Sequence, residues 1–202
     1  AYFFGASGLA DVWRMSLKIP NVIQNLLGEG TLSASVIPIY SELLEKKEDK
    51  SAGAFIGAAL GILLVVAVFT ALAGMVVVPA VLPSILVAWE PEKISLVSSL
   101  IRILFPMTAI LVISAWALAI LNSNKQFFLP YCAPVAWNGA IICCVSIMAW
   151  VYGVSGEELL VYAAWGALGG AVLQLFIQLP SIIKHLNNFV ISLGRGVLGV
   201  QE

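Results

Sequence analysis

The sequence predicts an all-α, polytopic integral membrane protein with five transmembrane helices. Of its 202 residues, 61% are hydrophobic and only 10% are charged, and the mean hydropathy is +1.02. In soluble domains about a quarter of the residues are charged. Several apolar runs also reach the length of about 20 residues that a helix needs to cross the hydrocarbon core of a bilayer. The connections between these runs are too short to favour core helices of a large soluble protein.

The elements follow from these runs. Four clean spans are predicted at about 53–78, 95–121, 127–152 and 159–183. A fifth segment, about 9–40, is long enough to cross but carries several polar residues, so we expect a broken polar helix. Residues 189–202 are expected to form an interfacial segment, either a helix on the membrane surface or the lead into another domain. The chain opens at Ala1 without Met or signal-peptide features, which favours a fragment.

The orientation follows from the basic residues of the short loops, because Lys and Arg stay on the cytoplasmic side. Two loops and the tail hold six of them, against Lys93 on the other side. We therefore expect 41–52, 122–126 and the C-terminal tail in the cytoplasm. The six are Lys46, Lys47, Lys50, Lys125, Lys184 and Arg195.

Composition excludes several functions. The formal charge of -1 offers no basic surface to nucleic acid. The cysteines have no C-x-x-C spacing, and His185 is the sole histidine, so neither a disulfide framework nor a zinc site is expected. No pairing of a nucleophile with a base and no phosphate-binding glycine loop is present, so we expect no enzyme, no metal and no cofactor.

The start of the polar segment is the candidate site. Positions three or four apart share one face of a helix. Arg14 and Lys18 should not face lipid there, because a charge at the bilayer centre costs roughly 2.5 to 3.5 kcal/mol on insertion scales. One interpretation is an Asp11–Arg14 ion pair with Lys18 extending to the interface. The other is a hydrated cationic cavity that binds a phosphate-bearing ligand. The residues of the predicted face are Asp11, Arg14, Lys18, Asn21 and Asn25, with Gln24 beside them.

The same segment contains a candidate hinge. Pro20 removes a helical hydrogen bond and predicts a kink or a break, and Gly28 and Gly30 follow within a few turns. Broken helices near the midplane are a device of transporters, although membrane helices also tolerate an ordinary proline kink. Glu29 is either a gating or proton-linked carboxylate or a residue at a cytoplasmic helix end.

Polar and small residues of the later spans have two interpretations. Asn122, Asn138, Gln174 and Gln178 either line a cavity or form interhelical hydrogen bonds. Gly166, Gly169 and Gly170 predict a face on which helices pack closely.

Three stretches in order resemble the MurJ/MviN family of lipid II flippases, in the multidrug/oligosaccharidyl-lipid/polysaccharide exporter superfamily. The first is Lys18-Ile19-Pro20-Asn21 with Gly28-Glu29-Gly30 and Pro38. The second is Phe105-Pro106 with Ile120-Leu121-Asn122, Phe127, Pro130, Ala133-Pro134 and Asn138. The third is Trp165, Gly170, Leu173-Gln174 and Gln178-Leu179-Pro180.

The resemblance implies a bacterial inner-membrane flippase with two lobes around a central cationic cavity, which moves lipid II outward by alternating access. Residues 1–188 would be the second to sixth helices of the N-terminal lobe, and the first helix and the C-terminal lobe would be missing. Asp11, Lys18, Asn21, Glu29 and Gly30 match family positions on the cavity side of the second helix. At Gln24 and Asn25 the family usually has one or two arginines, whereas this chain has Arg14 one turn before Lys18.

The expected partners are a polyprenyl-pyrophosphate-linked substrate, lipid II, and membrane lipids. Arg14 and Lys18 would bind the pyrophosphate, and Pro20, Gly28 and Gly30 would form the hinge. Another polyprenyl-linked polysaccharide flippase or a multidrug exporter of the superfamily is the first alternative. A membrane scaffold that transports nothing is the second.

Overall fold

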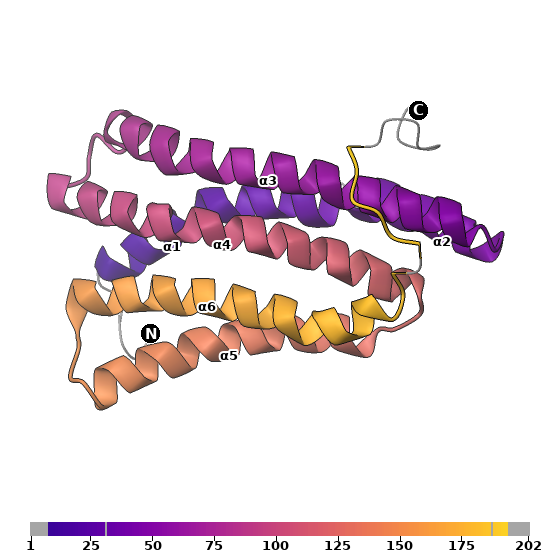
Figure 1. Cartoon of the computed structure of the whole chain (residues 1–202). Coiled ribbons are helices and arrows are strands. Elements are labelled where there is room, and N and C mark those ends of the chain that lie inside the picture. Colours follow the sequence, from indigo (N-terminus) through magenta and orange to yellow (C-terminus); the bar gives the residue numbers. More distant parts are fainter. Residues whose placement is uncertain (1–7, 31, 187, 194–202) are drawn as a thin grey trace.

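The computed structural model describes residues 8–30, 32–186 and 188–193, and in these residues it contains helices and no strand (Figure 1). Six α-helices form the body, and π-helical turns join the first two of them. The α-helices are α1 Gly8–Gln24, α2 Ile37–Glu45, α3 Asp49–Ile85, α4 Pro91–Ser123, α5 Phe128–Trp150 and α6 Gly156–Ile183, and the π-helical turns are η1 Asn25–Gly30 and η2 Leu32–Val36.

The predicted all-α polytopic class is confirmed. Four described helices, α3 to α6, are long and apolar enough to cross a membrane. α1 is not among them, because it has only 17 residues, and it also carries the charged residues Asp11, Arg14 and Lys18. The predicted bounds were too short for α3 and α4. Both helices begin four residues earlier than expected and continue past the predicted end. At 37 residues, α3 is about 55 Å long, so its ends extend beyond a hydrocarbon core of about 30 Å.

The helices run up and down, so the loops gather at two ends. The α2–α3 and α4–α5 loops lie at the same end as the last turn of α6 (Figure 1). Tyr40, Asn124 and His185 line one small cavity there, and the side chains of Gln126 and His185 are 2.9 Å apart. The start of α1 and the α3–α4 loop lie at the opposite end, where Gly8 and Lys93 line another cavity. This arrangement matches the alternation expected from the basic residues, so we call the two ends cytoplasmic and outer.

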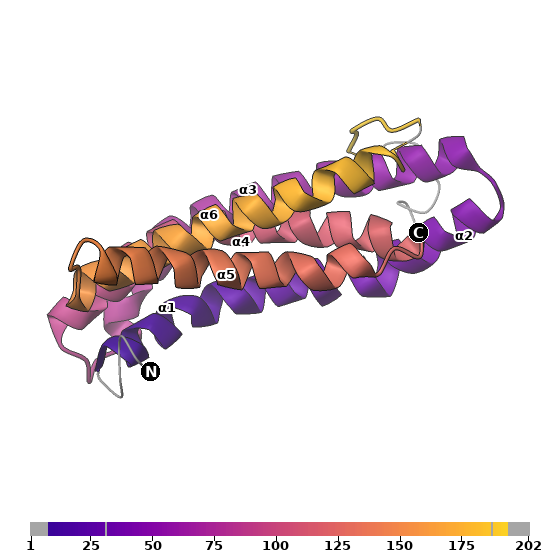
Figure 2. The ribbon, with the colours of Figure 1, turned by 90° about the horizontal axis from the view of Figure 1, so that it is seen from below.

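α4 is the central helix of the described bundle. It packs against α1, α3 and α6, whereas α5 packs chiefly against α6. Viewed from below, α5 lies nearest the viewer (Figure 2). In α5 just Ala133 and Val145 are buried, and large apolar side chains such as Tyr131 and Ile142 are exposed. An apolar helix with this exposure is suited to lipid rather than to water.

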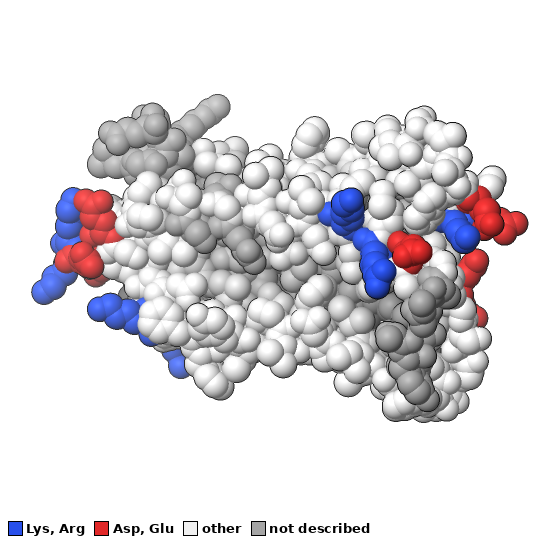
Figure 3. Space-filling model, turned by 180° about the vertical axis from the view of Figure 1, so that it is seen from behind, with Lys and Arg blue, Asp and Glu red and all other residues white. Residues whose placement is uncertain are grey.

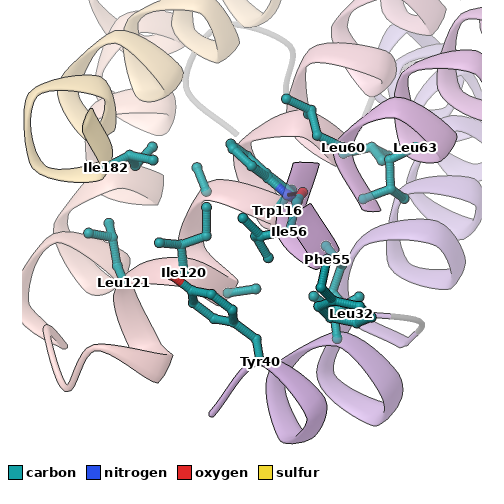
Figure 4. Close-up of a cluster of buried hydrophobic side chains, with 14 of the residues drawn as sticks. Leu32, Tyr40, Phe55, Ile56, Leu60, Leu63, Trp116, Ile120, Leu121 and Ile182 are labelled. Atoms are coloured by element: carbon teal, nitrogen blue, oxygen red, sulfur yellow. Dashed lines mark hydrogen bonds between the residues drawn. The ribbon is translucent and has the colours of Figure 1, made fainter. Parts of the chain in front are cut away.

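A cluster of aromatic and aliphatic side chains fixes the cytoplasmic half (Figure 4). Trp116 of α4 donates its indole N–H to the carbonyl of Ile56 in α3, at 3.1 Å, and its ring centroid is 6.0 Å from that of Phe189. Buried Tyr40 of α2 also belongs to this cluster. A buried indole needs such a polar partner, so the contact fixes α4 against α3.

The chain after α6 departs from the sequence prediction. Residues 189–193, called the strap below, are not helical and lie across α3. The backbone N–H of Ser192 donates to the carbonyl of Gly57 at 3.5 Å. An interfacial helix is therefore wrong for these five residues, and the rest of the predicted segment, 194–202, lies outside the described part of the chain. The contact forms because α3 has glycine where the strap crosses it.

Gly74 allows α3 to pack closely against α4, so its substitution should change the stability of the protein. A Cβ atom at Gly74 would overlap the ring of buried Phe105. We expect Gly74→Ala to lower the free energy of unfolding by about 1 to 3 kcal/mol, the usual range for overpacking. Gly139→Ala is the matched control, because nothing lies within 4 Å of a Cβ there. Thermal unfolding of the two purified variants of the complete protein measures the difference, and equal stability would contradict this packing.

Candidate functional site

The predicted polar face exists on α1. Val12, Ser16 and Pro20 are buried on one side of the helix, where α1 packs against α4. The candidate residues lie on the remaining surface. Of these, Asp11, Arg14, Lys18 and Asn25 are exposed, and Asn21 and Gln24 are half-buried.

Both interpretations of the charges have a counterpart in the structure. A guanidinium nitrogen of Arg14 lies 3.6 Å from a carboxylate oxygen of Asp11, with side chains 79% and 62% exposed respectively. Ion pairs this exposed contribute little to stability, with a median of about 0 to 1 kcal/mol. Lys18 has no ion pair with any described residue. One acid therefore faces two bases, and the exposed side of α1 is net positive.

The charged residues of α1 adjoin the charges of the outer end. On the face seen from behind, acidic and basic side chains gather at the two ends, and a smaller group interrupts the uncharged surface between them (Figure 3). The start of α1 adjoins the outer end, where Asp11 lines a cavity of about 250 Å³ together with Glu90 and Lys93. A hydrogen bond from Lys93 lowers the pKa of the Glu90 carboxyl, so Glu90 remains anionic at neutral pH. From this end, Lys18 lies about 10 Å further along the helix than Asp11.

Of the kink and the break that Pro20 left open, the structure excludes a break at Pro20 itself. α1 continues through Pro20 to Gln24, and α-helical geometry gives way to the π-helical turns η1 and η2 only afterwards. Pro20 is buried in an unbroken helix, so it behaves as the ordinary proline that membrane helices tolerate. The first crossing is nevertheless irregular, and π-helical turns are frequent at functional sites.

The glycines of the irregular stretch differ in their surroundings. A Cβ at Gly28 would lie 3.1 Å from the Cβ of Ala115, so Gly28 permits a close approach to α4. Gly30 lacks such a neighbour, since the nearest atom to a Cβ there is the carbonyl oxygen of Asn25 at 3.4 Å. The Glu29 side chain, predicted as either a gate or a helix-end residue, lies outside the described part of the structure.

The two glutamines of α6 form interhelical hydrogen bonds. Gln174 donates its amide to the Ser114 hydroxyl at 2.8 Å, and that hydroxyl donates to the amide oxygen of Gln178 at 3.1 Å. All three residues are buried, so this polar group joins α4 to α6 and does not line a site.

The two asparagines behave differently from the glutamines. Asn138 is exposed and donates to the carbonyl of Pro134 in its own helix, at 3.0 Å. Asn122 lines a cavity at the cytoplasmic end, together with Ser41 and Glu45.

The predicted glycine packing face is confirmed at two of its three positions. A Cβ at Gly166 would lie 2.8 Å from the Cβ of Cys144, and one at Gly170 would lie 2.8 Å from the carbonyl oxygen of Trp137. Nothing lies within 4 Å of a Cβ at Gly169, so this residue takes no part in the contact.

Two features of the structure escaped the sequence analysis. One is the contact between the strap and the glycines of α3. The other is a cavity of about 850 Å³ between α3 and α4, which contains Arg102. Its sequence signal is a single base in an apolar span that follows Ser95, Ser98 and Ser99 at helical spacing.

Comparison with known proteins identifies relatives of this architecture. The family model of the lipid II flippase MurJ matches residues 1–195. The probable lipid II flippase MurJ of Buchnera aphidicola subsp. Acyrthosiphon pisum is 31% identical over 217 aligned residues, which cover 98% of this chain and 41% of that protein. The lipid II flippase MurJ of Burkholderia cenocepacia is 31% identical, over 90% of this chain and 35% of its own length.

A solved structure has the same fold. The inward closed conformation of a lipid II flippase MurJ matches with a TM-score of 0.67 at 22% identity, over 98% of this chain and 40% of that chain. In each of these comparisons the chain spans about two-fifths of its relative or less.

Proposed function

Because this chain belongs to the MurJ family, whose model matches residues 1–195, we propose that its complete protein moves lipid II outward across the bacterial inner membrane by alternating access. The relatives are named for transport and not for a catalysed reaction. In this proposal residues 1–188 are the second to sixth helices of the N-terminal lobe, and the later residues lead into the second lobe. The supporting observation is the net positive, exposed face of α1 in an otherwise apolar membrane protein.

The face suits the pyrophosphate of a polyprenyl-linked precursor. Arg14 offers a planar fork of donors to phosphate oxygens, and Lys18 offers a compact charge. Asp11 holds Arg14 in place and limits the positive charge of the empty cavity. Asn21, Gln24 and Asn25 extend the same surface with neutral groups that donate and accept hydrogen bonds. In this scheme Glu29 gives the cytoplasmic end of the face a further polar group.

The π-helical turns supply the moving part of this proposal. A helix with irregular turns at Gly28 and Gly30 changes direction at a lower cost than a regular α-helix, since irregular backbone is tolerated where it lines a cavity. We therefore place the hinge at η1 and η2, which follow the continuous helix that contains Pro20. In this proposal the membrane potential supplies the energy, because moving one elementary charge through it is worth about 2.3 kcal/mol per 100 mV. Flipping that is insensitive to an imposed potential would remove this last step.

Complementation tests the function. The complete gene is expressed in bacteria depleted of their own MurJ, and growth and cell shape are followed. We expect rescue, because the proposed cargo is the one for which the relatives are named. Failure of the protein at normal membrane abundance would contradict lipid II as cargo and would favour another polyprenyl-linked saccharide.

The alternatives make different demands on the α1 face. A multidrug exporter for cationic compounds needs an acidic or apolar cavity, whereas this face carries two bases and one acid. A scaffold that transports nothing needs Arg14 and Lys18 to be dry and paired. Reaction of Cys introduced at position 18 with a membrane-impermeant maleimide would exclude the dry arrangement.

A further inference from the structure

The outer half of α3 and the first turns of α4 enclose a groove that the proposed transport does not use. Its cavity volume is about 850 Å³. α3 contributes an apolar wall and α4 contributes a polar edge, on which Arg102 is exposed. The residues that carry the argument are Pro79 and Pro83 of α3 and Ser95, Ser98, Ser99 and Arg102 of α4.

The polar edge lies at the depth of lipid headgroups. α4 has 33 residues, so it is about 50 Å long and exceeds the hydrocarbon core by roughly 10 Å at each end. Arg102 lies about 16 Å from the outer end of α4. Its Cα therefore lies about 6 Å inside the hydrocarbon boundary, and its long side chain extends from there toward the phosphates of the outer leaflet.

The charge of the groove is uncompensated. Of the three ion pairs in the described residues, none includes Arg102, and no acidic residue is among those that line the groove. The hydroxyls of Ser98 and Ser99 donate to the carbonyls of Ile94 and Ser95, at 2.8 Å and 3.0 Å. Their oxygens therefore remain available as acceptors for hydroxyl groups of a ligand.

We propose that this groove binds an anionic phospholipid of the outer leaflet, with its phosphate on Arg102, its headgroup hydroxyls on the serines and an acyl chain along the α3 wall. A guanidinium binds phosphate through two parallel hydrogen bonds. The missing acid decides the class of lipid. The ammonium of a zwitterionic phosphatidylethanolamine finds no carboxylate in the groove, whereas phosphatidylglycerol matches the single positive charge. The proposal does not depend on the transported cargo, and failed complementation would leave it intact.

Native mass spectrometry of the complete protein tests the proposal. The protein is equilibrated with equal amounts of phosphatidylglycerol and phosphatidylethanolamine before ionisation. We expect preferential retention of one phosphatidylglycerol, and a loss of about tenfold in that preference in Arg102→Gln, the equivalent of one charge-assisted hydrogen bond. Lys50→Gln is the matched control, because it removes an exposed base of the cytoplasmic end and should leave the preference unchanged.

A second variant tests whether the lipid needs the shape of the groove as well as the charge of Arg102. Ser98 is half-buried in the groove, so Ser98→Leu fills it while Arg102 keeps its charge. We expect this variant to lose the preference as well, with an unchanged thermal unfolding temperature. Equal retention of the two lipids by the parent protein would overturn the proposal. A finding that another segment of the complete protein fills the groove would overturn it as well. A preference that survives Ser98→Leu would overturn it too, because the charge alone would then attract the lipid.

Discussion

Lys18→Ala in the complete protein is expected to abolish rescue of MurJ-depleted cells, whereas Lys18→Arg is expected to retain much of it. Lys18 is the base of the α1 face that has no ion pair with a described residue. Removing it leaves Asp11 and Arg14, and so no net charge on that face. A hydrogen bond to a charged group contributes about 1.5 to 3 kcal/mol. We therefore expect a flipping rate about 10- to 100-fold lower, measured as growth and as accumulation of lipid II on the cytoplasmic side.

Arg14 tests whether the guanidinium itself or the net charge matters. Arg14→Ala leaves the exposed carboxylate of Asp11 opposite Lys18 and is expected to be as severe as Lys18→Ala. Combining it with Asp11→Asn returns the face to a net positive charge, so the double variant should recover part of the rescue. Lys50→Ala is the control, because it removes an exposed base of the cytoplasmic end. Full rescue by Lys18→Ala and Arg14→Ala at normal abundance would remove the α1 face as the site.

The spans and the alternation of their loops between two ends could be predicted because the bilayer imposes a local constraint on the sequence. A spanning segment must satisfy its backbone internally and be apolar outside, and both properties are local. The same locality predicted the exposed face of α1, since Asp11, Arg14 and Lys18 are one helical turn apart. The predicted ends of the helices were less accurate. α3 and α4 continue beyond their apolar runs, and outside the hydrocarbon core a high hydropathy is no longer needed for a helix.

Non-local contacts escaped prediction. From the sequence, Gln174 and Gln178 could either line a cavity or form interhelical hydrogen bonds. The structure decides this through Ser114, which lies 60 residues or more away in the chain. Pro20 left a kink and a break open, and the irregular backbone lies instead at η1 and η2, where Gly28 packs against Ala115. Gly57 and Gly61 gave no signal at all, because their partners follow more than 100 residues later.

Gly57→Ala and Gly61→Ala are expected to dislodge the strap from α3. A Cβ at Gly57 would overlap the carbonyl oxygen of Val190, and one at Gly61 would overlap that of Ser192. These obstacles are backbone atoms, which cannot turn aside as a flexible side chain does. The strap must therefore move as a unit, and its first residue, Phe189, would lose the ring contact with Trp116. We expect lower thermal stability in both variants, by about 1 to 3 kcal/mol each.

Labelling locates the change. In a version of the complete protein without Cys132, Cys143 and Cys144, Ser192→Cys is half-buried on α3 and should react slowly with a membrane-impermeant maleimide. We expect Gly61→Ala to increase this rate about tenfold, because closed and open positions of the strap then differ by roughly 1.4 kcal/mol less. Gly169→Ala is the control, since a Cβ there meets nothing within 4 Å. The sign of the stability change is decisive. Alanine favours an isolated helix over glycine by about 1 kcal/mol, so if the strap did not lie on α3, both substitutions would stabilise the protein instead of destabilising it.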